Sequence, residues 1–319
     1  MWLEQQRRSL VSLAELTRKD ILAVFRLADE LLTLPVSDRL AICEGKTLAT
    51  IFLQPSTRTR LSFESAMLLV GGTYISFGHP EMTKTSAGET FEDTVRVMSG
   101  YADVLVVRHA RDDAAAAADA LSAVPVINAG CGTLEHPTQA LTDLYTIHNL
   151  FGSIDGLTIG LMGDLRTQRT INSLAIALSR FSVNVHLICH PELNLRPETA
   201  SYLGDNVVVH STDSLADVLA ALDVLYIIRI DRLRTAGPDD YACLRGSRRL
   251  TAAQLAAAKP TLAVLNPLPR DDELAADVDS TIHARYFHQA HLGRPLRAAL
   301  LALMLGAADH RPPPPAAPS

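Results

Sequence analysis

LATIFLQPSTRTR, residues 48–60, joins an apolar run of strand type to a cluster of hydroxyl and guanidinium side chains. The proline and the residues after it are typical of a chain that leaves a buried strand and begins a helix. A helix N-terminus carries unsatisfied N–H groups and a partial positive charge, and Arg58 adds a planar fork that fits a phosphate group. The stretch therefore predicts a phosphate site, with an ordinary N-cap and solvated arginines as the simpler alternative.

Strand and helix patterns alternate along the rest of the chain. This alternation predicts an α/β fold of two domains, each with a mostly parallel sheet flanked by helices. The expected strands are residues 47–53, 73–77, 103–107, 124–127, 157–163, 183–188, 206–210, 223–229 and 262–266. The expected helices are residues 12–34, 57–70, 89–100, 112–121, 136–150 and 286–306.

The domain boundary is expected near residue 150, where Gly152 and Gly156 interrupt the pattern. Residues 1–150 would form the first domain and residues 151–285 the second. The apolar helix 286–306 would pack back on the first domain. The proline-rich tail, 309–319, is expected to be disordered.

Composition narrows the classes of function. The 319 residues carry a formal net charge of -6, and the basic residues form no stripe, so a nucleic-acid partner is not expected. No apolar run is long enough for a membrane span or a signal core, so no membrane association is expected. The four cysteines show none of the short spacings of zinc sites or disulfide scaffolds. Free thiols of this kind predict a reducing, cytoplasmic location.

Polar side chains follow several expected strands or open the helices after them, where open α/β sheets bind ligands. They are Arg108, His136, Gln139, Arg169, Arg229 and Arg270. Each alone is more simply a helix cap or a solvated arginine, but together they predict a site for a doubly anionic small molecule. The nucleotide pattern GxxxxGK[ST] and the dinucleotide pattern GxGxxG are absent, which weakens both of those interpretations.

A set of motifs extends over nearly the whole chain: FLQPSTRTRLSFESA, GETFEDT, VVRH, EHPTQAL, GDLR, VLYIIRI and NPLPR. In this order they resemble the aspartate/ornithine carbamoyltransferase family. The form HPTQ at 136–139, in place of HPCQ, favours the aspartate branch. The resemblance implies that the first domain binds carbamoyl phosphate and the second an amino acid, most simply L-aspartate, which receives the carbamoyl group. It also implies a homotrimer with shared active sites, no metal and no organic cofactor, and it leaves room for regulatory or partner chains.

The resemblance assigns roles residue by residue. Arg169 and Arg229 would bind the carboxylates of the acceptor. Arg58, Thr59, Arg108 and His136 would act on the reacting groups. The full set for carbamoyl phosphate would be Ser56, Thr57, Arg58, Thr59, Arg108, His136, Gln139, Pro267 and Leu268. Within it, Gln139 and the backbone carbonyls of Pro267 and Leu268 would hold the carbamoyl NH2.

The chain departs from the family pattern at several positions. Ala87 stands where the family has a lysine that reaches the neighbouring subunit's site, and Lys84 is a candidate replacement. Asp231 stands where a glutamine helps to orient the acceptor. A carboxylate there would repel the acceptor's carboxylate, attract an extra cationic group, or pair with a nearby arginine. Cys131 and Asn266 replace an aspartate and a histidine.

These departures keep three alternatives to aspartate carbamoylation open. The first is a carbamoyltransferase for another amine, such as a 2,3-diamino acid, which the altered acceptor half favours. The second is a non-catalytic paralogue that serves as a structural partner, favoured by Ala87 and opposed by the intact carbamoyl phosphate half. The third, a nicotinamide oxidoreductase, rests on the α/β pattern alone.

Overall fold

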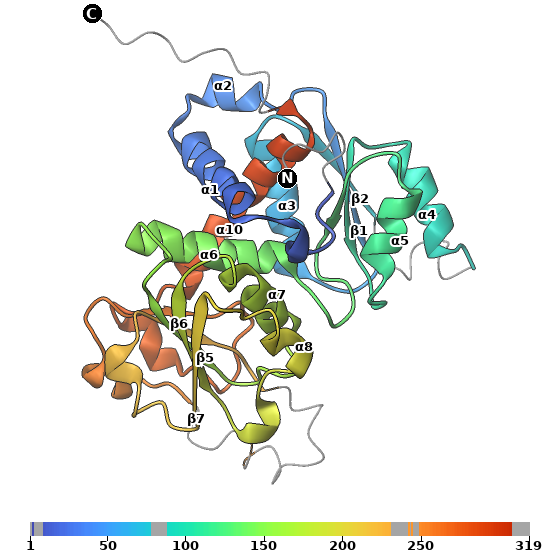
Figure 1. Ribbon diagram of the computed structural model, residues 1–319. Helices are drawn as coiled ribbons and strands as arrows, with labels where there is room; N and C mark the ends of the chain where they lie inside the picture. Colours follow the sequence, from blue (N-terminus) through green and yellow to red (C-terminus); the bar gives the residue numbers. More distant parts are fainter. Residues whose placement is uncertain are drawn as a thin grey trace, which may run out of the picture. The chain divides into compact units, whose positions relative to one another are not determined.

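The computed structural model describes residues 2, 9–77, 88–230, 242, 244 and 249–307. These residues form two compact units (Figure 1). Unit 1 comprises Met1–Gly132 and Arg294–Ser319, and unit 2 comprises Thr133–Gly293. Each unit is built around one parallel sheet flanked by helices, so the predicted fold class is confirmed.

The sheet of unit 1 has four strands in the order β2-β1-β3-β4. They are β1 (Thr47–Phe52), β2 (Thr73–Phe77), β3 (Val104–Arg108) and β4 (Val126–Asn128), and every pair is parallel. Because β2 and β3 lie on opposite sides of β1, the strand order reverses between β1 and β3. Such a reversal opens a crevice beyond the carboxyl ends of the two strands, where ligands bind in folds of this class.

Helices cover both faces of this sheet. Helices α4 (Phe91–Ser99) and α5 (Ala114–Leu121) bury the face that carries Ile51 and Val107. The other face is covered by α3 (Thr57–Leu69), as Figure 1 shows. The end of α10 (Tyr286–Met304) packs on α3, where the Arg297 guanidinium lies 5.2 Å from the centre of the Phe63 ring.

The predicted helix 12–34 is wrong as a single element. The structure has a 3₁₀ turn, Leu13–Glu15, followed by α1 (Arg18–Thr33) and a short α2 (Val36–Leu40). The break has a clear cause at Thr17. Its backbone N–H donates to the Asp20 carboxylate at 2.9 Å, while the Asp20 N–H donates to the Thr17 hydroxyl at 3.2 Å. This capping box begins a new helix inside an otherwise continuous apolar pattern.

The sheet of unit 2 has five parallel strands in the order β7-β6-β5-β8-β9. They are β5 (Thr158–Met162), β6 (Val183–Ile188), β7 (Val207–Thr212), β8 (Val224–Ile227) and β9 (Ala263–Leu265). Here the order reverses between β5 and β8. Within the part of this unit that the structure describes, the helices with defined bounds include α6 (Pro137–Phe151), α7 (Arg169–Leu178), α8 (Pro197–Ala200) and the beginning of α10.

The buried core of unit 2 joins β5, β6, β8 and β9 to the segments that follow β7, β8 and β9. Met162, Leu225 and Val264 contribute from the strands, and Leu250 and Tyr286 from the later segments. No helix among the described residues combines the length and the apolar character that crossing a bilayer requires.

Candidate active site

In unit 1 the predicted phosphate-binding residues meet at the reversal of strand order. Phe52, the last residue of β1, pairs with Arg108, the last residue of β3. The N–H of Leu53 continues the ladder to the Arg108 carbonyl at 2.9 Å. Ser56 then caps α3, so the hydroxyls of 56–59 and the guanidinium of Arg108 leave the same edge of the sheet.

The first turn of α3 is open toward a ligand. The Ser56 side chain makes no capping hydrogen bond. By contrast, Thr90 caps α4 by accepting the N–H of Asp93 at 3.1 Å. Thr57 and Arg58 are exposed, while Thr59 is buried. Helices α5, α6 and α7 also begin without a side-chain cap, so the anion-site interpretation rests on the residues gathered at the start of α3 and on their place at the reversal of strand order.

Arg108 is half-buried and held from the next strand. Its Nη1 donates to the Ala129 carbonyl at 3.1 Å, directly after β4. The turn that carries this carbonyl is fixed by Asn128, whose Oδ1 accepts the N–H groups of Gly130 and Cys131 at 2.9 and 2.8 Å. The side chain that replaces the family's aspartate, Cys131, is itself buried. The hydrogen bond to Ala129 and the turn fixed by Asn128 therefore orient Arg108 in the absence of a ligand.

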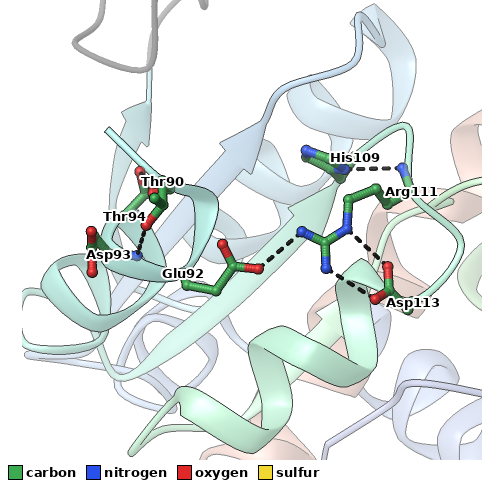
Figure 2. A network of polar contacts seen from close by, with 7 residues as sticks. All are labelled: Thr90, Glu92, Asp93, Thr94, His109, Arg111 and Asp113. Carbon is green, nitrogen blue, oxygen red and sulfur yellow. Dashed lines mark hydrogen bonds and ion pairs between the residues drawn. The ribbon is translucent and has the colours of Figure 1, made fainter. Parts of the chain in front are cut away.

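Figure 2 shows a second polar network, which ties the turn after β3 to the first turn of α4. Arg111 donates to Glu92 at 2.9 Å and, through two nitrogens, to both carboxylate oxygens of Asp113 at 2.9 Å. These hydrogen bonds hold the pKa of Glu92 and of Asp113 below their ordinary values. Burial, with the charge of Arg111, lowers the pKa of His109. The network fixes α4 against the strand that ends in Arg108.

In unit 2 the two predicted acceptor arginines lie at the other reversal of strand order. Arg169 opens α7 after β5, and Arg229 follows β8; both side chains are half-buried. The side-chain amide of Gln168 donates to the Arg229 carbonyl at 3.3 Å, which joins the two segments. Asp164 shapes the loop before α7 by accepting the N–H groups of Arg166 and Thr167 at 3.1 and 2.9 Å.

Gly163, directly after β5, lets the backbone approach the segment after β8 closely. Its φ is +122°, and a Cβ atom there would lie 1.9 Å from the Ile228 carbonyl oxygen. We expect Gly163→Ala to lower the free energy of unfolding by about 3 kcal/mol or more, because a backbone carbonyl cannot move aside. Denaturant unfolding would measure this. Gly156→Ala is the control, since Gly156 has a similarly positive φ (+82°) but nothing within 4 Å; it should cost about 1 kcal/mol. Equal losses would contradict the prediction.

His136, Gln139 and the turn after β9 complete the predicted set in unit 2. His136 is buried at the N-cap of α6, with Pro137 at the first helical position, and its backbone N–H donates to the Ser173 hydroxyl at 2.8 Å. Gln139 lies one turn into α6. Leu268 has a φ of 52°, in the left-handed region, so its backbone is held in a conformation that leucine rarely adopts.

Three of the residues discussed from the sequence cannot be placed, and one polar residue near the predicted site was not predicted. Lys84, Ala87 and Asp231 fall outside the described residues. Asp143 was missed, although it stands four positions after Gln139 and therefore on the same face of α6, a spacing that could have indicated it. Among the described side chains, no group of three or more His, Cys, Asp or Glu is arranged to hold a metal ion.

Comparison with known proteins places both units in one family. Residues 8–149 match the family model described as the carbamoyl-P binding domain of aspartate/ornithine carbamoyltransferase. Residues 155–304 match the Asp/Orn binding domain of the same family. The chain is 46% identical over 299 residues to the aspartate carbamoyltransferase catalytic subunit of Pyrobaculum calidifontis, covering 93% of this chain and 98% of that protein. The corresponding subunit of Thermococcus gammatolerans is 44% identical over 301 residues, covering 94% and 98%.

Solved structures agree with this assignment. The catalytic subunit of M. Jannaschii aspartate transcarbamoylase superposes with a TM-score of 0.88 at 38% identity, covering 95% of this chain and 99% of that one. Aspartate transcarbamoylase from Trypanosoma cruzi, in complex with N-(phosphonacetyl)-L-aspartic acid, gives 0.87 at 36% identity, covering 92% and 94%. The chain therefore belongs to the aspartate/ornithine carbamoyltransferase family, and the resemblance read from its motifs is confirmed.

Proposed function

We propose that this chain transfers the carbamoyl group of carbamoyl phosphate to the amino group of L-aspartate, releasing N-carbamoyl-L-aspartate and phosphate. One observation carries the proposal: each sheet places its predicted anion-binding residues at its own reversal of strand order. Arg108 and the start of α3 lie at one, and Arg169 and Arg229 lie at the other. The Trypanosoma cruzi relatives, solved with carbamoyl phosphate and with carbamoyl aspartate, support the same substrates.

The chemistry follows from the groups at these places. A neutral amine forms a bond to the carbamoyl carbon, the bond from that carbon to the phosphate oxygen breaks, and the leaving phosphate takes the amine proton. Negative charge that grows on the carbonyl oxygen would be stabilised by Thr59, Arg108 and His136. Because these donors are set in place before reaction, they need no reorganisation, and holding the two reactants together supplies much of the rest.

The direct test is an acceptor panel. Purified protein would be incubated with carbamoyl phosphate and with aspartate, ornithine or 2,3-diaminopropionate, and carbamoylated products detected by mass spectrometry. We expect product from aspartate. Binding of carbamoyl phosphate without product from any amine would refute the proposed activity and favour a non-catalytic role.

Asp231 favours a second candidate acceptor, because its carboxylate would attract the extra ammonium group of a 2,3-diamino acid. If it has this role, Asp231→Gln lowers the rate with 2,3-diaminopropionate relative to aspartate by about 10-fold or more, since an opposite charge is lost. The ratio of kcat/KM for the two amines measures this effect. An unchanged ratio would remove Asp231 from acceptor selection.

We further propose a cytoplasmic homotrimer with shared active sites, open to regulatory or partner chains. The relatives' designation as catalytic subunits supports an assembly. Among the described cysteines, none forms a disulfide, as is usual in a reducing compartment; they are Cys43, Cys131 and Cys189. Sedimentation equilibrium should give three times the 34.5 kDa chain mass; a monomer would refute the shared sites.

The functional division is proposed at about residue 150, with residues 1–150 and helix 286–306 serving carbamoyl phosphate and 151–285 the acceptor. The two family models, which meet between residues 149 and 155, support this boundary.

A further inference from the structure

Asp143 is a fully buried carboxylate that three side chains contact from different elements of unit 2. Its Oδ1 accepts the amide N–H groups of Gln139, on α6, at 2.8 Å and of Gln289, on α10, at 2.6 Å. Its Oδ2 accepts the Tyr226 hydroxyl, on β8, at 2.9 Å. Burial, with the nearby carboxylate, raises the pKa of Tyr226 well above its ordinary value, so the phenol keeps the proton that it donates. These donors compensate the buried charge.

The same network continues from Gln289 to the turn after β9. The side-chain carbonyl oxygen of Gln289 accepts the backbone N–H of Asn266 at 3.0 Å. The Asn266 side chain then accepts the N–H of Leu268 at 2.7 Å and donates to Glu273 at 2.9 Å. Asn266, Glu273 and Gln289 are all at least 97% buried. The left-handed conformation of Leu268 is therefore held by Asn266, the residue that replaces the family's usual histidine.

Every amide in this network has its orientation fixed by a partner that can play only one role. A carboxylate accepts hydrogen bonds but does not donate, and a backbone N–H donates but does not accept. Gln289 lies between the Asp143 carboxylate and the Asn266 N–H, so its two ends cannot exchange. Gln139 must turn its NH2 group toward Asp143. Its carbonyl oxygen is then the atom that it can offer to a ligand.

We infer that Asp143 is a positioning residue that makes the site selective for a carbamoyl group over an acyl group. The inference rests on the proposed function, in which Gln139 and the carbonyls of Pro267 and Leu268 receive the carbamoyl NH2. Asp143 orients the first acceptor directly and the other two through Gln289 and Asn266. Acetyl phosphate has the same phosphate and carbonyl groups but a methyl in place of the NH2. It would leave these acceptors without donors, which strongly disfavours binding.

The experiment compares affinities for carbamoyl phosphate, acetyl phosphate and inorganic phosphate by calorimetry. In Asp143→Ala the preference for carbamoyl over acetyl phosphate should fall by about 10-fold or more, because Gln139 is no longer oriented, while phosphate affinity stays within about threefold. Gln289→Met removes one donor to Asp143 and the acceptor for Asn266 but leaves the contact between Gln139 and Asp143 in place, so it should give a smaller fall in the same direction. This variant carries the test if Asp143→Ala does not fold.

Two further variants separate positioning from a structural role. Asp143→Asn should keep the preference, because the fixed Gln289 NH2 holds the new amide oxygen in the same place and its NH2 can donate to the Tyr226 oxygen. Thr142→Ala is the matched control, since the buried Thr142 hydroxyl only donates to the Thr138 carbonyl at 2.8 Å on the same helix. It should leave all three affinities unchanged.

Two results would overturn the inference. One is an unchanged preference in both Asp143→Ala and Gln289→Met. The other is an equal loss of affinity for all three ligands, which would mean that Asp143 only maintains the fold. A wild-type chain that binds neither carbamoyl phosphate nor phosphate would instead refute the proposed function, and with it the premise of this inference.

Discussion

Arg108→Ala is expected to lower kcat/KM for carbamoyl phosphate by about 10²–10³-fold, the usual effect of removing one pre-set donor from a developing oxyanion. Arg108 is the only described arginine that ends a strand of unit 1, and it lies at the reversal of strand order beside the open start of α3. Its contact with the Ala129 carbonyl orients it in advance. Arg108→Lys should not restore activity, since a point charge cannot reproduce the planar fork.

Steady-state kinetics and calorimetric binding of phosphate would measure the effect. The matched control is Arg96→Ala, which removes an arginine from the same unit. Arg96 is exposed on α4, and its guanidinium pairs with Asp93 at 3.1 Å, one turn away on the same helix. Such surface pairs contribute little, so activity should change by less than about threefold. A folded Arg108→Ala protein with near-normal kcat/KM would remove Arg108 from the proposed chemistry.

Most strands were predictable because they are buried, largely apolar runs, as in β1, β3, β5 and β8. The edge strands β2 and β7 are mostly exposed, and their β-branched and aromatic residues made them predictable instead. Each predicted strand is present, and no end differs by more than two residues. The bounds of the N-terminal helix could not be predicted, because the capping box of Thr17 and Asp20 begins a new helix within one apolar pattern. The five residues of α2 were missed for a different reason, since so short a helix carries too little periodicity to detect.

The site residues that could be predicted are those whose position follows from the local sequence. Arg108 ends a strand, Arg229 follows one and Arg169 opens a helix, and chain direction alone places them at the carboxyl edge. The hydrogen bonds that orient Gln139 and Leu268 could not be predicted from the sequence, because Asp143 contacts residues 83 and 146 positions further along the chain. In the sequence it resembles any polar residue of an amphipathic helix. Only the packing of β8 and α10 against α6 adds two distant donors, Tyr226 and Gln289, to the local donor Gln139.

Arg229→Ala should lower kcat/KM for aspartate by about 100-fold, since truncating one partner of a close charge pair costs about 2–5 kcal/mol. Binding of carbamoyl phosphate should stay within about threefold of wild type, because Arg229 is assigned to the acceptor's carboxylates, whereas Arg108 and the start of α3, assigned to the phosphate, lie in unit 1. Arg285→Ala is the control, since Arg285 is exposed before α10 in the same unit.

A second acceptor amine tests which carboxylate of aspartate Arg229 binds. L-Alanine carries the same amino and α-carboxylate groups as aspartate but lacks the side-chain carboxylate. If Arg229 binds that carboxylate, the preference for aspartate over alanine falls with the substitution, because only aspartate loses a partner. If Arg229 binds the α-carboxylate, both amines slow equally, and Arg169 becomes the residue whose removal changes the preference. Loss of carbamoyl phosphate binding in step with aspartate turnover would contradict both assignments, because it would mean that the substitution damages more than the acceptor half.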